Sequence, residues 1–165
     1  MKNYGCMDEV SRLAVEVGSH YVSLGTPDPW FLFIPQFHLT PELARAILCP
    51  FQAMSLAFKS FRIDDSQLRR KALESYHQGL AEQRHLLNLA CSKEGATKEC
   101  VFWALLMAVS LLNFEMIAPC SPYAWFGHAQ GATRLLSMLT PETCQESPYF
   151  EIYRHLRYMM VRFSL

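Results

Sequence analysis

VFWALLMAVSLLNFEMI, residues 101–117, is the most apolar stretch of the 165-residue chain and decides its fold. Its apolar side chains would point to every side of a helix, and a helix without a polar face must be surrounded by other elements. Ser110, Asn113 and Glu115 interrupt the run, which we consider too short to span a bilayer. Thr97 is placed to cap a helix over residues 98–117. We therefore predict a buried helix at the centre of an all-α domain.

Two helices are expected before this central one. Thr40-Pro41-Glu42 combines a capping hydroxyl, a first-turn proline and an acid at the positive end of the helix dipole, so a helix should run from there to about residue 61. Pro50 lies inside it and should kink or split it, because proline removes a hydrogen-bond donor. Asp64 or Asp65 is expected to cap the next helix, which runs to about residue 90 with one apolar face.

Two more helices are expected after the central one. Ser121-Pro122 and Ser147-Pro148 place a capping hydroxyl before a proline, which predicts helices over about 121–139 and 149–163. Glycine and proline are sparse within these patterns, and no strand is predicted. The sequence therefore favours an irregular helical bundle or αα-layered domain of about five helices. The still apolar last helix suggests a hydrophobic face that needs a partner.

The first forty residues are less regular. Residues 10–22 fit a short helix, Thr26-Pro27-Asp28-Pro29 breaks the chain, and the apolar run Trp30–Ile34 can pack on the core without regular structure. We therefore divide the chain into a lead-in segment, 1–39, and a helical domain, 40–165.

Composition excludes several classes of protein. The formal charge is zero, from 15 basic and 15 acidic residues, so the basic excess of a free-standing nucleic-acid binder is missing. The six cysteines form no CxxC pair, which argues against a local zinc site and favours free, mostly buried thiols in a reducing compartment. The charged N-terminus has no apolar core of a signal peptide. These features indicate an intracellular protein that neither spans a membrane nor binds DNA directly.

Residues 121–139 carry the most specific polar pattern. Trp125 and His128 fall on one helical face, and Gly127 and Gly131, four apart, form a smooth strip where another helix could approach closely. Glycine costs about 1 kcal/mol in a helix interior, so two of them imply tight packing or a functional contact. We interpret His128 as a structural hydrogen-bonding residue in a helix–helix crossing.

Glu115 lies near the C-terminal end of a buried helix, where the dipole disfavours an anion, and therefore needs a partner. His128 or Arg134 on the next helix could reach it. A buried carboxylate beside a histidine is compatible with acid–base chemistry, but no nucleophile or ligand-spaced motif accompanies it, and a structural pair is favoured.

Other polar clusters have simpler interpretations. Asp64-Asp65 fits a helix cap better than a metal site, and Arg69-Arg70-Lys71 fits a solvated face. No GxSxG, HExxH or glycine-rich phosphate loop is present. We assign no catalytic, cofactor-binding or metal-binding residue, and we do not expect an enzyme.

Five motifs, in order, resemble the regulatory domain of fungal zinc-cluster transcription factors, the fungal-specific transcription factor domain. The most specific is Trp-x2-His-x2-Gly-Ala with a leucine-rich tail, WFGHAQGATRLL at 125–136. The others are TPELARAIL at 40–48, LESYHQGL at 73–80, the apolar helix 105–112 with Phe114-Glu115, and FEIYRHLR at 150–157.

The resemblance implies a nuclear transcription regulator, in a setting that includes control of secondary-metabolite gene clusters. Such a module would bind a small-molecule inducer, other transcription regulators or a second copy of itself, through helix faces and an apolar pocket near Trp103 and Trp125. The family's six-cysteine DNA-binding cluster is missing, and its regulatory domain continues further, so a truncated half-domain is expected. The positions that carry the family signature, with structural or interaction roles, are Tyr76, Glu115, Trp125, His128, Gly131, Ala132 and Arg134.

Two other hypotheses remain open. Helix pairs with short loops are compatible with a helical scaffold or adaptor unrelated to transcription, although no repeat of about 34 residues is visible. A small helical enzyme using Glu115 and His128 would require both side chains to line an open cavity.

Overall fold

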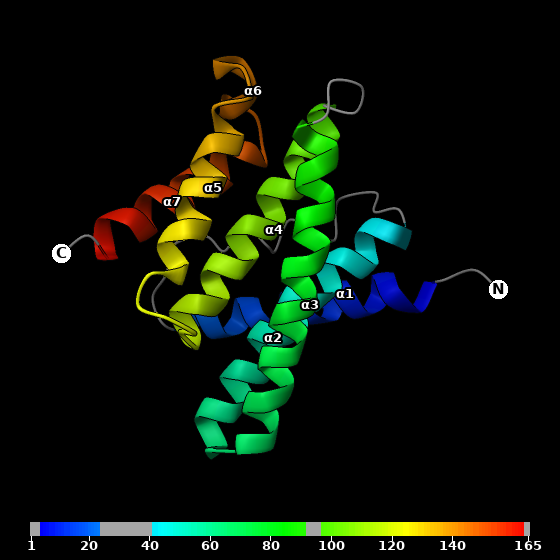
Figure 1. The fold of residues 1–165 in the computed structure, drawn as a ribbon, viewed down its shortest axis with the longest axis vertical. Helices are drawn as coiled ribbons and strands as arrows, with labels where there is room; N and C mark the ends of the chain where they lie inside the picture. The colour runs from blue at the N-terminus through cyan, green and yellow to red at the C-terminus, as the bar shows by residue number, and fades with distance from the viewer. Residues whose placement is uncertain (1–3, 24–40, 92–96, 164–165) are drawn as a thin grey trace.

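Seven helices and no strand form the regular structure of residues 4–23, 41–91 and 97–163, the part of the chain that the computed structural model describes (Figure 1). This confirms the predicted all-α fold. The helices are α1 (Tyr4–Ser23), α2 (Pro41–Ile63), α3 (Ser66–Cys91), α4 (Lys98–Ile117), α5 (Ala124–Leu136), α6 (Pro141–Gln145) and α7 (Tyr149–Phe163). The expected Thr40 cap, the break at Thr26–Pro29 and the run Trp30–Ile34 lie outside the described residues.

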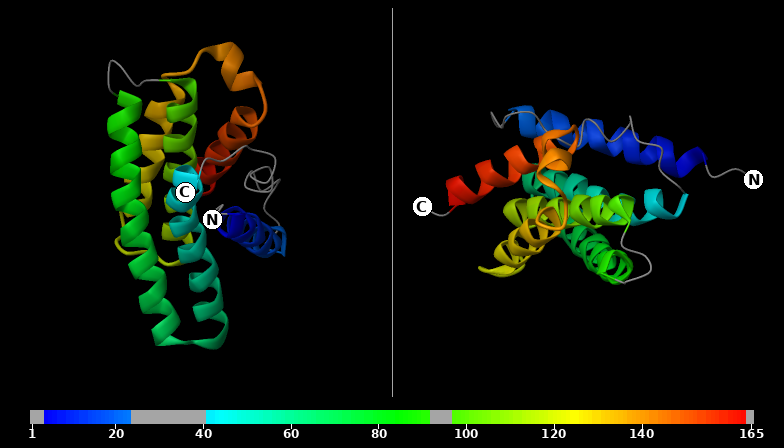
Figure 2. Two further views of the ribbon diagram at one scale, coloured as in Figure 1. Left: turned by 90° about the vertical axis from the view of Figure 1, so that its right-hand side faces the viewer. Right: turned by 90° about the horizontal axis from the view of Figure 1, so that it is seen from above.

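The predicted central helix is α4, and every residue from Val101 to Glu115 is buried. Helices α2, α3, α5 and α7 pack against it, and α2 to α5 run roughly alongside one another, while α1 lies across α2 (Figure 2). α4 begins three residues before the apolar run, so by length and composition alone it could cross a membrane. However, 83% of its most apolar window is buried by the rest of the protein, as in a core helix.

Helix starts follow local capping in three places. The Thr97 hydroxyl accepts a hydrogen bond from the amide of Cys100 at 3.1 Å, as expected for the start of α4. Asp65, the second of the two aspartates proposed as a cap, accepts from the amides of Gln67 and Leu68 at the start of α3. At 140–142, Thr-Pro-Glu starts the short helix α6 in the same way.

Three predicted helix limits were wrong. The fourth helix was expected over 121–139, but α5 spans only Ala124–Leu136 and its N-cap, Tyr123, makes no side-chain capping bond. Residues 121–123 form a bend and a turn instead, and the Trp125 indole nitrogen donates to the carbonyl of Pro122 at 3.1 Å. The short helix α6, which follows α5, was not predicted. Helix α1 is longer than the short helix expected over 10–22.

Pro50 does not split α2, which continues through it from Pro41 to Ile63. The side chains that follow it, Phe51 and Met54, are fully buried, and their packing holds the helix together across the missing hydrogen bond. Gly79 of α3 lies against the proline. A Cβ atom at position 79 would be 3.5 Å from Pro50 Cδ and 3.3 Å from Leu111 Cδ2 of α4. Gly79 therefore marks a point where three helices approach closely.

A buried polar contact links α7 to the central helix. His155 Nε2 lies 3.0 Å from Asn113 Oδ1, and the Asn113 amide donates to the carbonyl of Val109 at 2.8 Å. Burial lowers the pKa of His155 to about 4. The imidazole is therefore neutral at pH 7 and suited to a buried hydrogen bond.

We predict that Gly79→Leu lowers the free energy of unfolding by about 1–3 kcal/mol, because the new side chain would overlap α2 and α4. Gly131→Leu is the matched control, since a Cβ atom there meets nothing within 4 Å of it. Urea denaturation followed by circular dichroism measures both. Equal stability of the two variants would contradict the close approach at Gly79.

We also predict that the protein loses stability as the pH falls from about 6.5 toward 4. In this interval the unfolded chain binds a proton at His155 while the folded protein does not, so the free energy of unfolding falls with pH, by about 3 kcal/mol at most. His155→Gln should flatten this dependence, whereas the exposed His77→Gln should leave it unchanged. Parallel pH profiles for wild type and His155→Gln would refute the assignment.

Candidate functional site

Three of the positions singled out in the sequence meet at the junction of α3, α4 and α5. Tyr76 of α3 places its hydroxyl 3.0 Å from Nε2 of His128 of α5. The phenol ring stacks on Phe114 of α4, with ring centroids 4.5 Å apart and an interplanar angle of 19°. Glu115 is the residue after Phe114 in α4, and it interacts electrostatically with both Tyr76 and His128. We call Tyr76, Glu115, His128 and Cys120 the polar cluster.

Glu115 connects the cluster to the turn after α4. It is only 2% exposed, and its Oε2 accepts a hydrogen bond from the backbone amide of Cys120 at 2.8 Å. Its Oε1 accepts none from the described residues. An anion is disfavoured at a helix C-terminus, and the amide of Cys120 offsets part of that cost. Arg134, one of the two partners considered for Glu115, is exposed and forms no ion pair with it.

Burial and one negative charge determine the protonation of the cluster. Burial raises the pKa of Tyr76, and the Glu115 carboxylate raises it further. Cys120 is exposed as a residue, but partial burial of its thiol and the same carboxylate raise the pKa of the thiol to about 12. Burial lowers the pKa of His128, although Glu115 opposes this. At pH 7, phenol, thiol and imidazole are therefore all neutral, so the cluster holds neither a thiolate nucleophile nor a charged imidazolium.

The remaining signature positions lie along α5, and only some face the core. Ala132 is fully buried, while Trp125 is half-buried beside the turn that its indole holds. Gly131 and Gly127 were expected to admit another helix, but a Cβ atom at either position meets nothing within 4 Å. The close helix approach predicted at these two glycines is therefore not formed within the described structure and occurs at Gly79 instead.

The apolar pocket expected near Trp103 and Trp125 is not formed by these two residues together. Trp103 lies 14 residues before the end of α4, which is about 21 Å along the helix axis, whereas Trp125 is in the first turn of α5, just after that end. Trp103 instead packs against Phe102, which contacts Tyr149 of α7. Neither of the two grooves described below includes either tryptophan.

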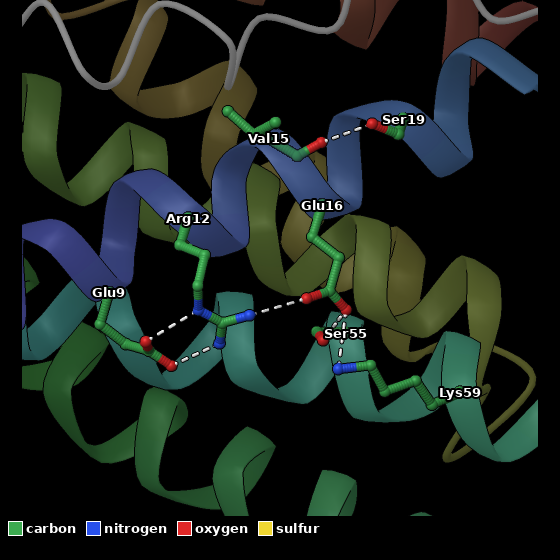
Figure 3. Close-up of polar contacts among 7 residues, drawn as sticks. All are labelled: Glu9, Arg12, Val15, Glu16, Ser19, Ser55 and Lys59. Atoms are coloured by element: carbon green, nitrogen blue, oxygen red, sulfur yellow. Dashed lines mark hydrogen bonds and ion pairs between the residues drawn. The ribbon is translucent and has the colours of Figure 1, made fainter.

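A second set of polar residues, missed in the sequence, joins α1 to α2 (Figure 3). The Arg12 guanidinium binds both oxygens of Glu9, at 2.7 and 3.0 Å, and one oxygen of Glu16 at 3.0 Å. The other oxygen of Glu16 accepts from Ser55 at 2.6 Å and pairs with Lys59 at 2.9 Å. Burial alone would raise the pKa of Glu16, but Ser55, Lys59 and Arg12 together hold it below its usual value.

This network was missed because its two halves are far apart in sequence. The spacing of Glu9, Arg12 and Glu16 is a signal for pairing within one helix. The contact from Glu16 to Ser55, 39 positions away, depends on how α1 lies on α2.

Two surface grooves lie near these polar sets. The first, of about 430 Å³, follows the α1–α2 network toward α3 and has charges of both signs, including Arg12, Glu9, Lys71 and Glu74. The second, of about 320 Å³, lies between α2, α3 and the end of α4, and we call it the alanine groove. Ala57, Ser60 and Phe61 line it from α2, Arg69, Ala72 and Leu73 from α3, and residues 117–119 from the end of α4.

The cluster is suited to holding helices in register rather than to acid–base chemistry. An enzyme using Glu115 and His128 requires both side chains to line an open cavity, but Glu115 is enclosed and neither residue lines either groove. No group of three or more histidine, cysteine or acidic side chains is placed to hold a metal ion within residues 4–23, 41–91 and 97–163. The geometry thus gives the acid–base hypothesis no support.

The cysteines and the acidic pair were predicted with mixed success. Cys49, Cys100, Cys120 and Cys144 are free thiols, but of these four only Cys49 is buried, so the expectation of mostly buried thiols was wrong for the cysteines that the structure describes. Asp65 caps α3, as the capping interpretation expected.

Compared with known proteins, the chain matches no family model, no curated protein and no solved structure.

We predict that Tyr76→Phe lowers the free energy of unfolding by about 1–2 kcal/mol, because it removes the partner of the half-buried His128. Tyr123→Phe, at a side chain that is 80% exposed, should change it by less than about 0.5 kcal/mol. Chemical denaturation compares the two variants, and a histidine titration by NMR reports whether the pKa of His128 moves in Tyr76→Phe. A variant with unchanged stability and an unchanged His128 pKa would show that the contact is unimportant.

Proposed function

We propose that the chain is a helical regulatory module of transcription control, acting by binding another protein or a small molecule rather than DNA. One observation carries the proposal: residues from three of the five motifs that resemble the fungal regulatory domain converge. Tyr76 comes from the motif at 73–80, and His128 belongs to the motif at 125–136. Glu115 belongs to the motif in which the apolar segment 105–112 is followed by Phe114-Glu115. The meeting of these positions at one junction is what a shared structural signature of that regulatory domain would produce, and it supports the proposal.

The cost of the polar cluster also supports a specific role. A buried carboxylate at a helix C-terminus is unfavourable, and apolar side chains would stabilise the junction at least as well. Buried polar groups fix one arrangement of helices, because the alternatives leave them unpaired. Such an arrangement suits a module that must present one defined surface to a partner.

The zero net charge and the exposed apolar side chains fit the same role. The chain lacks a basic excess, which argues against phosphate contacts. Large apolar side chains that remain exposed lie on several helices, including Phe61, Phe126 and Val161. By the same resemblance, we propose that the module works in the nucleus, with a second regulator or another copy of itself as partner. The same resemblance brings the control of a secondary-metabolite gene cluster into the proposal.

The scaffold hypothesis receives no comparable support. A scaffold of repeated helix pairs requires like pairs stacked at a constant angle. Here α1 lies across α2, while α2 to α5 run roughly alongside one another (Figure 2).

We predict that residues 1–165, fused to an unrelated DNA-binding domain, change the expression of a reporter gene under the matching promoter. Co-expression of the unfused chain with a full-length zinc-cluster regulator should also change that regulator's output. The control is Leu105→Asp, which places a charge in the core and should abolish both effects by unfolding the module. Unchanged transcription in both assays, with the protein folded and present in the nucleus, would refute the proposal.

A further inference from the structure

The alanine groove is a hollow that the sequence builds with small side chains. Ala57 of α2 and Ala72 of α3 are almost fully buried at its base, where larger residues would fill the space between the helices. Leu73 and Ile117 add apolar walls. Phe61 stands at the rim and is 80% exposed. A volume of about 320 Å³ with mainly apolar walls lies at the lower end of the range for small-molecule sites.

One charged side chain lines this groove, that of Arg69. Its Nη2 lies 3.0 Å from Asp64 Oδ1, but the Asp64 side chain is 94% exposed and Arg69 is also largely in solvent. Exposed ion pairs contribute only about 0–1 kcal/mol, so a better-placed anion can displace Asp64. The guanidinium offers paired donors that match a carboxylate.

The second polar side chain of the groove adds no competing charge. Ser60 is buried, and its hydroxyl donates to the carbonyl of Ala57 at 2.9 Å. The groove thus combines apolar walls with one cation, which is complementary to a molecule with an apolar body and one anionic end.

We propose that the alanine groove binds a small amphipathic carboxylic acid. Its apolar part lies over Ala57 and Ala72, and its carboxylate pairs with Arg69. The occupant is a soluble small molecule rather than a membrane lipid or a protein helix, because the hollow has a volume of only about 320 Å³ and a single charged lining residue.

The position of the groove connects it to the polar cluster. Residues 117–119 line it, and the next residue is Cys120, whose amide is held by Glu115. Ala72 lies one helical turn before Tyr76 on the same face of α3. A ligand in the groove therefore contacts the elements that hold the cluster. This inference rests on the proposed function for its biological meaning, since it names the class of molecule that the regulatory module senses.

The test is direct binding of octanoate to the purified chain, measured by isothermal titration calorimetry and by the shift in melting temperature. We expect saturable binding of octanoate with a higher melting temperature, binding at least ten-fold weaker for octanol, and none for octylamine. Arg69→Gln should weaken octanoate binding at least ten-fold. Arg70→Gln, the neighbouring arginine that does not line the groove, should bind as wild type does.

A second pair of variants tests the hollow itself. Ala118→Leu, at a half-buried residue that lines the groove, fills part of the hollow and should abolish binding, while Ala81→Leu, on an exposed part of α3, should not. Circular dichroism and the melting temperature without ligand establish that each variant folds.

Three outcomes would overturn the proposal. One is the absence of saturable octanoate binding to the folded wild type. Another is equal binding of octanoate and octylamine, or of wild type and Arg69→Gln, which would indicate unspecific apolar adsorption. The third is binding to vesicles of anionic phospholipid without binding to free octanoate, which would assign the surface to a membrane. None of these results predicts the outcome of the reporter assay. The proposal of ligand binding can therefore fail while the proposal of transcription regulation stands, and the reverse.

Discussion

From Val101 to Glu115, α4 has no side of its surface in contact with water, and this constraint determines where the other helices lie. Each apolar side chain of α4 must be covered, so α2, α3, α5 and α7 pack around it. The same constraint limits polarity within the helix. Ser110 and Asn113 are tolerated because each donates to a carbonyl one turn earlier. Glu115 is tolerated because the chain turns back and brings the amide of Cys120 to it.

Local signals were sufficient to predict much of the fold. The apolar run identified α4 as central, and the caps Thr97 and Asp65 gave the starts of α4 and α3. These features depend on residues within one turn of each other, which a sequence displays directly. The predicted start of α5 was wrong because Ser121 does not cap it: the chain turns at residues 122–123, where the Trp125 indole donates to the carbonyl of Pro122, and this contact has no capping signature in the sequence.

The candidate site depended on contacts that no local pattern displays. Glu115 and His128 were recognised as belonging together, but Tyr76, 52 positions from His128, supplies the hydrogen bond that was expected from Glu115. The position of Tyr76 depends on how α3 lies on α4, where the Tyr76 ring stacks on Phe114. The glycines of α5 had the spacing of a close crossing, whereas the single Gly79 makes one, because spacing describes a helix surface and not what covers it.

The contact between Pro50 and Gly79 also has a consequence for how the sequence can change over time. Residue 50 lacks the amide hydrogen that would strengthen α2, and residue 79 lacks the side chain that would strengthen α3, so each position by itself is poorly suited to a helix. The missing side chain at 79 leaves room for two neighbours, since a Cβ atom there would lie 3.3 Å from Leu111 Cδ2 and 3.5 Å from Pro50 Cδ. The contact with Leu111 is the tighter of the two, so a larger residue at 79 would require Leu111 to give way as well as the ring at 50. Positions 50, 79 and 111 are therefore epistatic, and the effect of a substitution at one should depend on the residues at the other two.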